Sequence, residues 1–385
     1  MARFQLFSED SETPVVDAIR GRVLLTLALG VAVMLLLDLL AGLAGIEIAE
    51  FGGRTLGGEI ELSTVGKRIW TGTIVGLIFG LAGIGLSMTY SILNFANFSH
   101  GDLFTTGAFT GWGVALLVAG WGVGDAGYLL LARSGTGPSS TDIGASIIAS
   151  PLAILIGVVV AAVATTGVAL LADRFVYRPM RDRGGIPLLI ASIGVALALR
   201  STVQFVYGPQ TRGVTGTEGI ERTDFLGTGL SVDLHQVTLL VVALGLMIAM
   251  HLLLQRTKLG KAMRAMADNK DLALVTGIPT ERIVRATWIL GASLAGIAGF
   301  LYVLERGTMN YNVGWFLLLF IFAGVILGGI GSIYGAIAGG LVIGFVHEVS
   351  LIWISSDFNA AAAFLIMILV LLYRPEGIFG GVTTA

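Results

Sequence analysis

Long apolar stretches separated by short polar connections make up most of the chain. A helix that crosses a bilayer needs about 20 consecutive, mostly apolar residues. Most of the stretches reach that length, so the pattern predicts about ten membrane segments. They lie at residues 23–43, 70–92, 103–118, 147–171, 186–206, 237–254, 286–304, 314–329, 333–349 and 360–373.

The runs at 103–118, 314–329 and 360–373 are short, and each is interpreted as a re-entrant, tilted or broken helix or as a complete crossing. The count is therefore open by one or two. The run at 23–43 is interpreted as a membrane helix rather than a cleaved signal peptide, because mostly polar residues precede it and no clear cleavage site follows. The predicted fold class is an all-α polytopic membrane protein with about ten transmembrane or partly re-entrant helices.

Basic residues in the connections predict the orientation, because cytoplasmic loops carry an excess of Lys and Arg. The connection at 255–285 has seven basic residues and that at 173–185 has four, so both are expected in the cytoplasm. The mainly acidic connections at 44–61 and 208–234 are expected outside. Ten passes with both termini in the cytoplasm satisfy all four assignments, although Lys67 and Arg68 count mildly against them.

The composition agrees with a membrane protein and excludes several functions. Of the 385 residues, 55% are hydrophobic and 12% are charged, against roughly a quarter charged in soluble domains. A net charge of -2 gives no electrostatic basis for binding nucleic acid. The chain has no Cys, which excludes disulfides, thiolate metal sites and Cys nucleophiles.

The sequence contains no pattern for enzyme chemistry. Its two Gly-Lys pairs are followed by Arg68 and Ala262, not by the Ser or Thr of a Walker A loop. The four His residues lack metal-ligand spacing, and no connection is long enough for a soluble catalytic domain. We therefore expect no metal, no cofactor and no catalytic activity in this chain.

Glycines recur at every fourth position in two places. They are Gly72, Gly76 and Gly80 in one predicted helix, and Gly331, Gly335 and Gly339 in another. Small residues at this spacing leave one helix face bare, so that a neighbouring helix can approach closely. Plain helix packing is the simpler interpretation, and a face that lines a translocation path is the alternative.

A polar segment interrupts the pattern between the second and third runs. It contains Asn94, Asn97, Ser99, His100 and Asp102. Such a break is either a solvated turn at a helix end or a discontinuous element that lines a cavity at membrane depth. Physical reasoning weights the two interpretations equally.

Arg200 and Asp38 lie within apolar runs, where an ionisable side chain is costly and usually faces a partner or water. Arg200 is near enough to the end of its run to extend toward the outer interface instead. A place in a translocation path is the functional interpretation, and it fits Arg200 better than Asp38.

The connection at 255–285 is the most informative. Residues 262–276 have a helix-forming composition that mixes apolar and charged side chains, and Gly277 followed by Pro279 is typical of a helix C-terminus. A short amphipathic helix in a cytoplasmic loop either lies on the lipid surface or docks into a groove of a partner subunit.

Five segments are recognisable as family motifs. They are YSILNFANFSHGDLFTTGAF at 90–109, ADNKDLALVTGI at 267–278, ILGASLAGIAGFLY at 289–302, LGGIGSIYGAIAGG at 327–340 and YRPEGIFG at 373–380. In this order they resemble the permease subunits of branched-chain amino acid ABC transporters, a group that includes urea and short-amide permeases. The first contains the NFAHGD-type signature, with Ser99 in place of the usual Ala. The resemblance is closer to the shorter of the two permease types of that family.

The resemblance implies a heteromeric importer, with two permease subunits, two cytoplasmic ATPase subunits and an external solute-binding protein. It identifies 262–278 as the coupling helix, with Asp271, Ala273 and Gly277 at the Glu, second Ala and Gly positions of the EAA-xxx-G pattern. Arg264 and Lys270 complete the predicted ATPase contact. The predicted translocation path consists of Asn94, Asn97, His100, Asp102 and Arg200.

The predicted organisation is a polar cytoplasmic tail at 1–22, an extra helix and external loop at 23–65, the permease domain at 66–380 and a short tail at 381–385. Residues 1–65 have no firm counterpart in the family. The expected location is the cell membrane, in contact with lipid.

Three other functional classes are alternatives. An ion-coupled secondary transporter would need acidic residues at membrane depth, and Asp38 is the one that lies clearly inside a run. A membrane enzyme would need paired carboxylates or a His cluster. A passive channel for a small polar solute such as urea would need the Gly-rich segments to line a pore. Among solutes, branched-chain amino acids lead over urea and short amides.

Overall fold

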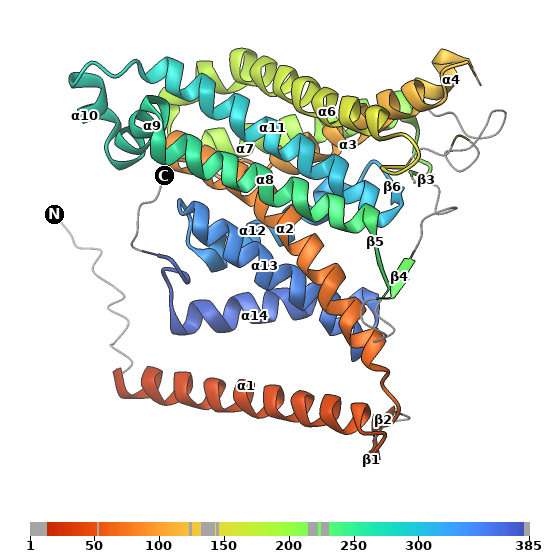
Figure 1. Ribbon diagram of the computed structural model, residues 1–385. Helices are drawn as coiled ribbons and strands as arrows, with labels where there is room; N and C mark the ends of the chain where they lie inside the picture. The colour runs from red at the N-terminus through yellow and green to blue at the C-terminus, as the bar shows by residue number, and fades with distance from the viewer. Residues whose placement is uncertain are drawn as a thin grey trace.

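Apolar helices account for most of the computed structural model, which describes residues 14–51, 54–122, 125–131, 143, 146–214, 222–224 and 231–380 (Figure 1). Within these residues, eight helices are long and apolar enough to cross a membrane, and two further apolar helices are shorter. The predicted all-α polytopic fold with about ten membrane helices is therefore confirmed.

The helices follow the predicted apolar runs, with some ends extended. The longer ones are α1 (Pro14–Leu43), α2 (Leu62–Leu93), α3 (His100–Ala119), α6 (Pro151–Ala172), α7 (Gly185–Tyr207), α8 (Leu234–Arg256), α11 (Thr280–Arg306), α12 (Val313–Gly328), α13 (Ile333–Val349) and α14 (Asn359–Tyr373). The short ones are α4 (Ala126–Leu131), η1 (Asp173–Tyr177, a π-helix), η2 (Arg178–Arg183), α9 (Lys258–Asp268), α10 (Lys270–Val275), η3 (Ser350–Ile352) and η4 (Ser356–Phe358).

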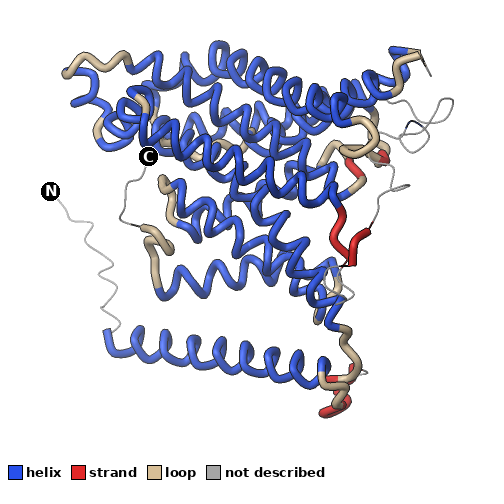
Figure 2. Tube along the Cα trace, viewed as in Figure 1, coloured by secondary structure: helices blue, strands red, loops and turns tan. Residues whose placement is uncertain are grey.

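The described strands gather at one end of the helical bundle, and α9 and α10 lie at the other (Figure 2). The strands form three antiparallel pairs: β1 (Glu47–Phe51) with β2 (Arg54–Gly57), β3 (Arg212–Gly213) with β6 (Thr308–Met309), and β4 (Arg222–Asp224) with β5 (Ser231–Asp233). We call these two ends the strand end and the α10 end. Parts of the 208–234 connection, at 215–221 and 225–230, lie outside the described residues.

The two most basic connections of the chain, 173–185 and 255–285, lie together at the α10 end. Arg181 of η2 forms ion pairs with Asp173 and with Glu281 at the start of α11, the latter at 2.8 Å. The acidic 44–61 connection and the described part of 208–234 lie at the strand end. The connections that the charge pattern assigned to one side of the membrane are therefore together in space.

Helix α1 begins at Pro14 and is attached to the rest of the bundle through Asp38. The Asp38 carboxylate is 7% exposed and accepts hydrogen bonds from the Gly57 backbone (2.6 Å) and from Trp353 Nε1 (2.9 Å). These two donors explain how an acidic residue is accommodated inside an apolar helix, because each carboxylate oxygen has a partner.

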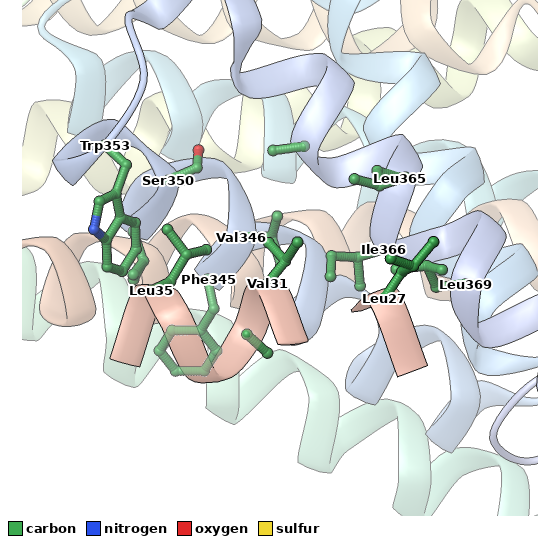
Figure 3. Close-up of a pocket in the computed structure, with 13 residues that line it drawn as sticks. Leu27, Val31, Leu35, Phe345, Val346, Ser350, Trp353, Leu365, Ile366 and Leu369 are labelled. Carbon is green, nitrogen blue, oxygen red and sulfur yellow. The ribbon is translucent and has the colours of Figure 1, made fainter. Parts of the chain in front are cut away.

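A cavity of about 540 Å³ separates α1 from α13 and α14 (Figure 3). Aliphatic and aromatic side chains such as Val31, Leu35, Phe345 and Ile366 line it, together with the hydroxyl-bearing Ser350. A polar solute would find almost no hydrogen-bonding partner in this cavity, so a translocation site has to be sought elsewhere in the bundle.

Glycines bring α2 and α13 into close contact at the centre of the fold. Gly72, Gly76 and Gly80 all face α13, and a Cβ atom at Gly76 would come within 2.8 Å of the Leu341 Cα atom. Packing of two helices at such short range leaves no space for a side chain between their backbones.

The second glycine ladder is divided between a helix and a turn. Gly335 and Gly339 pack against the backbone of α12. Gly331, in contrast, precedes α13 with a φ of 91°, and its N–H donates to Ser87 Oγ at 3.0 Å. The prediction that Gly331 belongs to the same helix is wrong, because its left-handed backbone conformation belongs to the turn that connects α12 to α13.

Candidate functional site

The polar segment after α2 starts at the exposed Asn94 and continues into the bundle. Helix α2 ends with Asn94 in the left-handed conformation (φ 54°), and the chain then turns back along the helix. His100, the first residue of α3, donates from Nε2 to the Ala82 carbonyl at 2.9 Å. Ala82 lies about 16 Å before the end of α2, at a rise of 1.5 Å per residue. From Asn97 to Asp102 the break is therefore largely enclosed by protein, unlike a solvated turn at a helix end.

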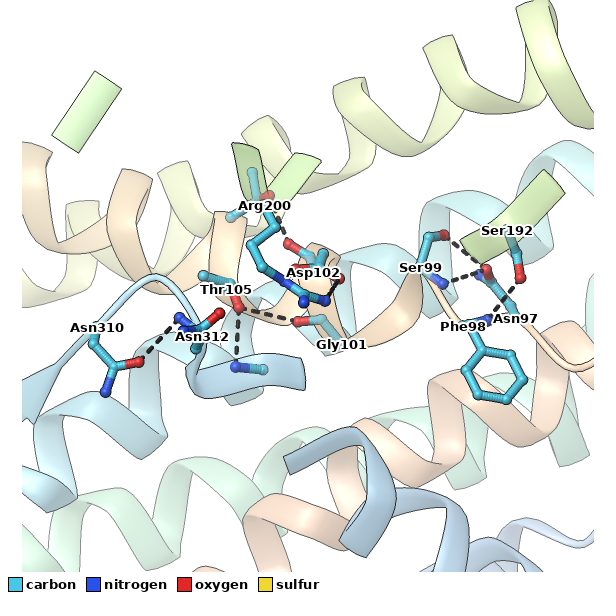
Figure 4. Close-up of polar contacts among 12 residues, drawn as sticks. Asn97, Phe98, Ser99, Gly101, Asp102, Thr105, Ser192, Arg200, Asn310 and Asn312 are labelled. Atoms are coloured by element: carbon cyan, nitrogen blue, oxygen red, sulfur yellow. Dashed lines mark hydrogen bonds and ion pairs between the residues drawn. The ribbon is translucent and has the colours of Figure 1, made fainter. Parts of the chain in front are cut away.

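Hydrogen bonds fix the turn between α2 and α3 to two other elements. Asn97 Oδ1 accepts from Ser99 Oγ at 2.7 Å, and Ser99 is also 2.8 Å from the hydroxyl of Tyr177 in η1. The backbone N–H of Phe98 donates to Ser192 of α7 at 3.0 Å (Figure 4). The side chain of Asn97 is fully buried, so this group holds the segment in place.

An ion pair follows within the first turn of α3. Arg200 of α7 donates from Nε and Nη2 to the two oxygens of Asp102, at 3.2 and 3.0 Å (Figure 4). The guanidinium lies over the ring of Trp315 in α12, 4.1 Å from its centroid. Arg200 therefore points to a buried carboxylate and an aromatic face, and the alternative in which it extends to the outer interface is wrong.

Helix α12 also begins inside the bundle. Its Gly314 N–H donates to Thr105 Oγ1 of α3 at 3.0 Å, and the Gly101 and Gly314 backbones pack against each other. At 16 residues α12 is about 24 Å long, less than the roughly 30 Å of a hydrocarbon core. Two interrupted helices thus begin side by side, next to the Asp102–Arg200 pair (Figure 4).

The structure brings together only part of the predicted path. Asp102 and Arg200 pair directly, whereas Asn97 belongs to the separate group with Ser99 and Tyr177. His100 is 1% exposed and bonded to α2, and Asn94 lies on the surface at the α10 end. The Arg200 side chain is 14% exposed, so a part of it stays accessible beside the Asp102 pair.

Several polar and aromatic neighbours of this site were not identified from the sequence. They are Thr105, Tyr177, Ser192, Asn310, Asn312 and Trp315. A second polar break, just before the short run at 314–329, contains the two Asn residues and was the available signal. The other four residues belong to apolar helices or to a basic connection. Thr, Ser, Tyr and Trp are common there, so nothing in the sequence marks them.

The predicted coupling helix consists of two helices. Asn269 separates α9 from α10 with an extended backbone (φ -157°, ψ 103°), and its Oδ1 accepts the Leu272 N–H at 2.9 Å. The prediction of one continuous helix over 262–276 is wrong at this residue, because the Asn side chain caps a new helix more favourably than it continues the old one.

The predicted left-handed cap at Gly277 is confirmed. Its φ is 84°, and the N–H groups of Gly277 and Ile278 donate to the carbonyls of Leu274 and Ala273, which is the Schellman arrangement. Nothing lies within 4 Å of a Cβ atom built on Gly277. The end of α10 therefore presents an open surface.

The side chains of this loop divide into buried and exposed sets. Leu272 and Leu274 are 60% exposed and Val275 is 84% exposed. Ala273 is buried and so faces the bundle rather than a partner. Three exposed apolar side chains on so short a helix form a surface that is typical of a contact with a partner protein or with lipid.

The charged residues of the loop have different surroundings. Arg264 donates to the Leu254 carbonyl at 2.8 Å and thereby fixes α9 to the end of α8. Lys270 is exposed and borders a small polar pocket with Arg181 and Glu281. Asp271 is exposed in the first turn of α10.

A second buried charged cluster lies at the strand end. Glu348 of α13 is 1% exposed and accepts a hydrogen bond from Arg306 of α11 at 2.5 Å. Arg68 of α2 is 3.6 Å away, and His347 Nδ1 is 3.1 Å away. This cluster connects the central helices α2, α11 and α13. Arg68 has an acidic partner in it, and this pairing accounts for a basic residue at the end that was predicted to be external.

Comparison with known proteins gives a family match over most of the chain. Residues 68–373 match the model of the family described as branched-chain amino acid transport system / permease component. The chain is 28% identical to the high-affinity branched-chain amino acid transport system permease protein LivH of Escherichia coli K12, over 82% of this chain and 95% of that protein. It is equally similar, with the same coverage, to the permease protein BraD of Pseudomonas aeruginosa.

The permease protein LivM of Escherichia coli K12 matches over a smaller region. It is 28% identical over 38% of this chain and 34% of that protein. No solved structure matches the chain.

Proposed function

The chain belongs to the family of permease components of branched-chain amino acid transport systems, and on this premise we propose that it carries branched-chain amino acids through the membrane as one subunit of an ABC importer. The observation that carries the proposal is the continuous family match from 68 to 373, which extends from the first turns of α2 to the end of α14. The chain is a transport component, and chemical energy has to come from another protein.

The proposed assembly contains a second permease subunit, two cytoplasmic ATPase subunits and an external solute-binding protein. The names of the relatives support a permease pair, because LivH and LivM are both permease proteins of branched-chain amino acid systems. The exposed apolar side chains of α10 support docking of an ATPase at that end.

The proposed orientation places the α10 end in the cytoplasm and the strand end outside. The Lys and Arg content of the 255–285 and 173–185 connections supports it. Both termini are then cytoplasmic.

The proposed path runs along the interrupted helices α3 and α12, where Asp102, Arg200 and Trp315 meet at membrane depth. Irregular backbone within a membrane occurs where it is covered by protein or lines a water-filled cavity. Asn97 and His100 would hold this segment rather than contact the solute, because both are fully enclosed.

The test is ATP-dependent uptake by the complete transporter. The tagged chain should co-purify with an ATPase subunit, and proteoliposomes containing the complex, the binding protein and internal ATP should accumulate leucine. An ion-coupled transporter or a channel would instead take up solute without ATP and without an ATPase partner. Accumulation of urea or acetamide but not leucine would contradict the proposed substrate.

A further inference from the structure

Arg200 has an unusual setting for a cation at membrane depth. It lies about 10 Å before the end of α7, at 1.5 Å per residue. Its Nε and Nη2 atoms bind Asp102, and its flat face covers the Trp315 ring at 4.1 Å. The Nη1 atom takes no part in the Asp102 pair, and 14% of the side chain remains exposed. One edge of a fixed guanidinium is therefore left for another group.

The partners of Arg200 fix its direction. Asp102 is 1% exposed, so it orients the guanidinium from the buried side and is shielded from solute. Trp315 is in the first turn of α12, and its backbone N–H donates to the backbone carbonyl of Asn312. The position of the indole ring is thus set by the start of that helix. The arrangement combines a planar cation with a buried carboxylate and an aromatic face.

We propose that the free edge of Arg200 binds the carboxylate of the transported solute, so that the path accepts carboxylate-bearing amino acids and not neutral amides such as urea. A guanidinium offers paired N–H donors in the geometry that a carboxylate requires. The Asp102–Arg200 pair is neutral as a whole, and an amino acid zwitterion is neutral too. Its passage therefore adds no net charge to a low-dielectric region.

This inference rests on the proposed function and adds a selectivity element to it. A hydrophobic pocket alone discriminates weakly between small solutes, whereas a site that hydrogen-bonds a polar group rejects analogues that lack it. The external binding protein would choose among amino acids, and Arg200 would require the carboxylate within the membrane.

The first test compares variants of the buried pair in the complete transporter. Arg200→Lys keeps the charge but loses the planar fork, and the double variant Asp102→Asn with Arg200→Met removes both charges so that none is left unpaired. Leucine uptake per assembled complex should fall about tenfold or more in the double variant and severalfold in Arg200→Lys. Uptake within about twofold of wild type in the double variant would show that transport does not need Arg200, and would overturn the proposal.

A matched control removes the other buried pair. Arg306→Met with Glu348→Leu eliminates an ion pair of the same kind at the strand end. We expect this control to retain leucine uptake. Equal loss of uptake in both double variants would indicate that any buried pair is needed for the fold, and would overturn the assignment to Arg200.

The second test uses the wild-type complex and needs no substitution. 4-Methylpentanoate carries the carboxylate of leucine without its ammonium group, and isoamylamine carries the ammonium group without the carboxylate. At equal concentrations, leucine and 4-methylpentanoate should raise the Tm of the purified complex, and isoamylamine should not. A shift from isoamylamine as large as that from 4-methylpentanoate would overturn the inference. If wild type transports no leucine at all, the proposed function itself fails.

Discussion

Buried carboxylates in the described bundle have defined partners. Asp38 accepts from a backbone N–H and from Trp353, Asp102 pairs with Arg200, and Glu348 pairs with Arg306. An uncompensated charge in a low-dielectric interior costs several kcal/mol, and hydrogen bonds or an opposite charge offset part of that cost. These side chains therefore act through their pairs, and their effects should be measured as pairs.

Removal of one member of the Glu348 pair should destabilise the protein strongly. In Arg306→Met, the enclosed Glu348 keeps only the more distant Arg68 and the neighbouring His347. We expect a loss of about 3 kcal/mol in the free energy of unfolding in detergent. The double variant with Glu348→Leu should recover most of that loss, to within about 1 kcal/mol of wild type. An unchanged Arg306→Met variant would mean that the pair contributes nothing.

Sequence reasoning finds charged residues at membrane depth but not their partners. Asp102 and Arg200 were both recognised, yet 98 residues separate them, and no spacing rule connects two different helices. Glu348 was not recognised, because it lies in the last turn of an apolar run, where a charge normally reaches the membrane surface. Pairing depends on helix packing, which the local pattern does not encode.

Among the helices, the close contact of α2 and α13 should be the least tolerant of added volume. A Cβ atom at Gly76 would meet backbone atoms of Leu341 and Gly340, which cannot move aside as a side chain can. Gly76→Val should therefore cost about 1–3 kcal/mol of stability or more. Gly245 in α8 is the control, since nothing lies within 4 Å of its Cβ position. Thermal unfolding that is equally affected in Gly76→Val and Gly245→Val would contradict a role in packing.

The end of α10 allows coupling to be separated from folding. Gly277→Val places a β-branched residue at a φ of 84°, with a strain of roughly 1–2 kcal/mol but no clash within the chain. The variant should reach the membrane and accept the binding protein, yet lose uptake together with substrate-stimulated ATP hydrolysis.

Gly58 provides the matched control for this strain. It has the same φ of 84° and open surroundings, but it lies at the strand end. Gly58→Val should keep stimulated hydrolysis close to the wild-type rate. If Gly277→Val also keeps it, α10 lies on lipid and does not transmit the energy of ATP.

Helix boundaries could be predicted where the length of an apolar run sets them. They could not be predicted where a capping side chain or a left-handed residue sets them. The long runs became helices because about 20 apolar residues satisfy both the bilayer and the backbone. Asn269 and Gly331 end regular structure through a side-chain cap and a left-handed backbone, and both had been assigned to helix interiors. The return of the chain from Asn94 to His100 could not be predicted either, because a polar segment fits a turn and a re-entrant break equally well.

At the scale of the whole molecule, the two ends of the bundle differ in charge and in exposed surface. The α10 end contains the basic connections and three exposed apolar side chains, including Val275 at 84% exposure. The strand end contains the β pairs and the Glu348 cluster. Under the proposed function, the positive-inside rule and an ATPase contact would both assign the α10 end to the cytoplasm.

Single cysteines can test the orientation directly, because the chain has no Cys of its own. Thr211 is exposed at the strand end beside β3, and Val275 is exposed on α10. In spheroplasts, a membrane-impermeant maleimide should label Thr211→Cys at once and Val275→Cys only after lysis. After lysis, Val275→Cys should react more slowly in the complete complex than in the isolated permease, because the ATPase would cover it. The reverse labelling order would invert the topology, and equal rates with and without the ATPase would place the ATPase contact somewhere other than α10.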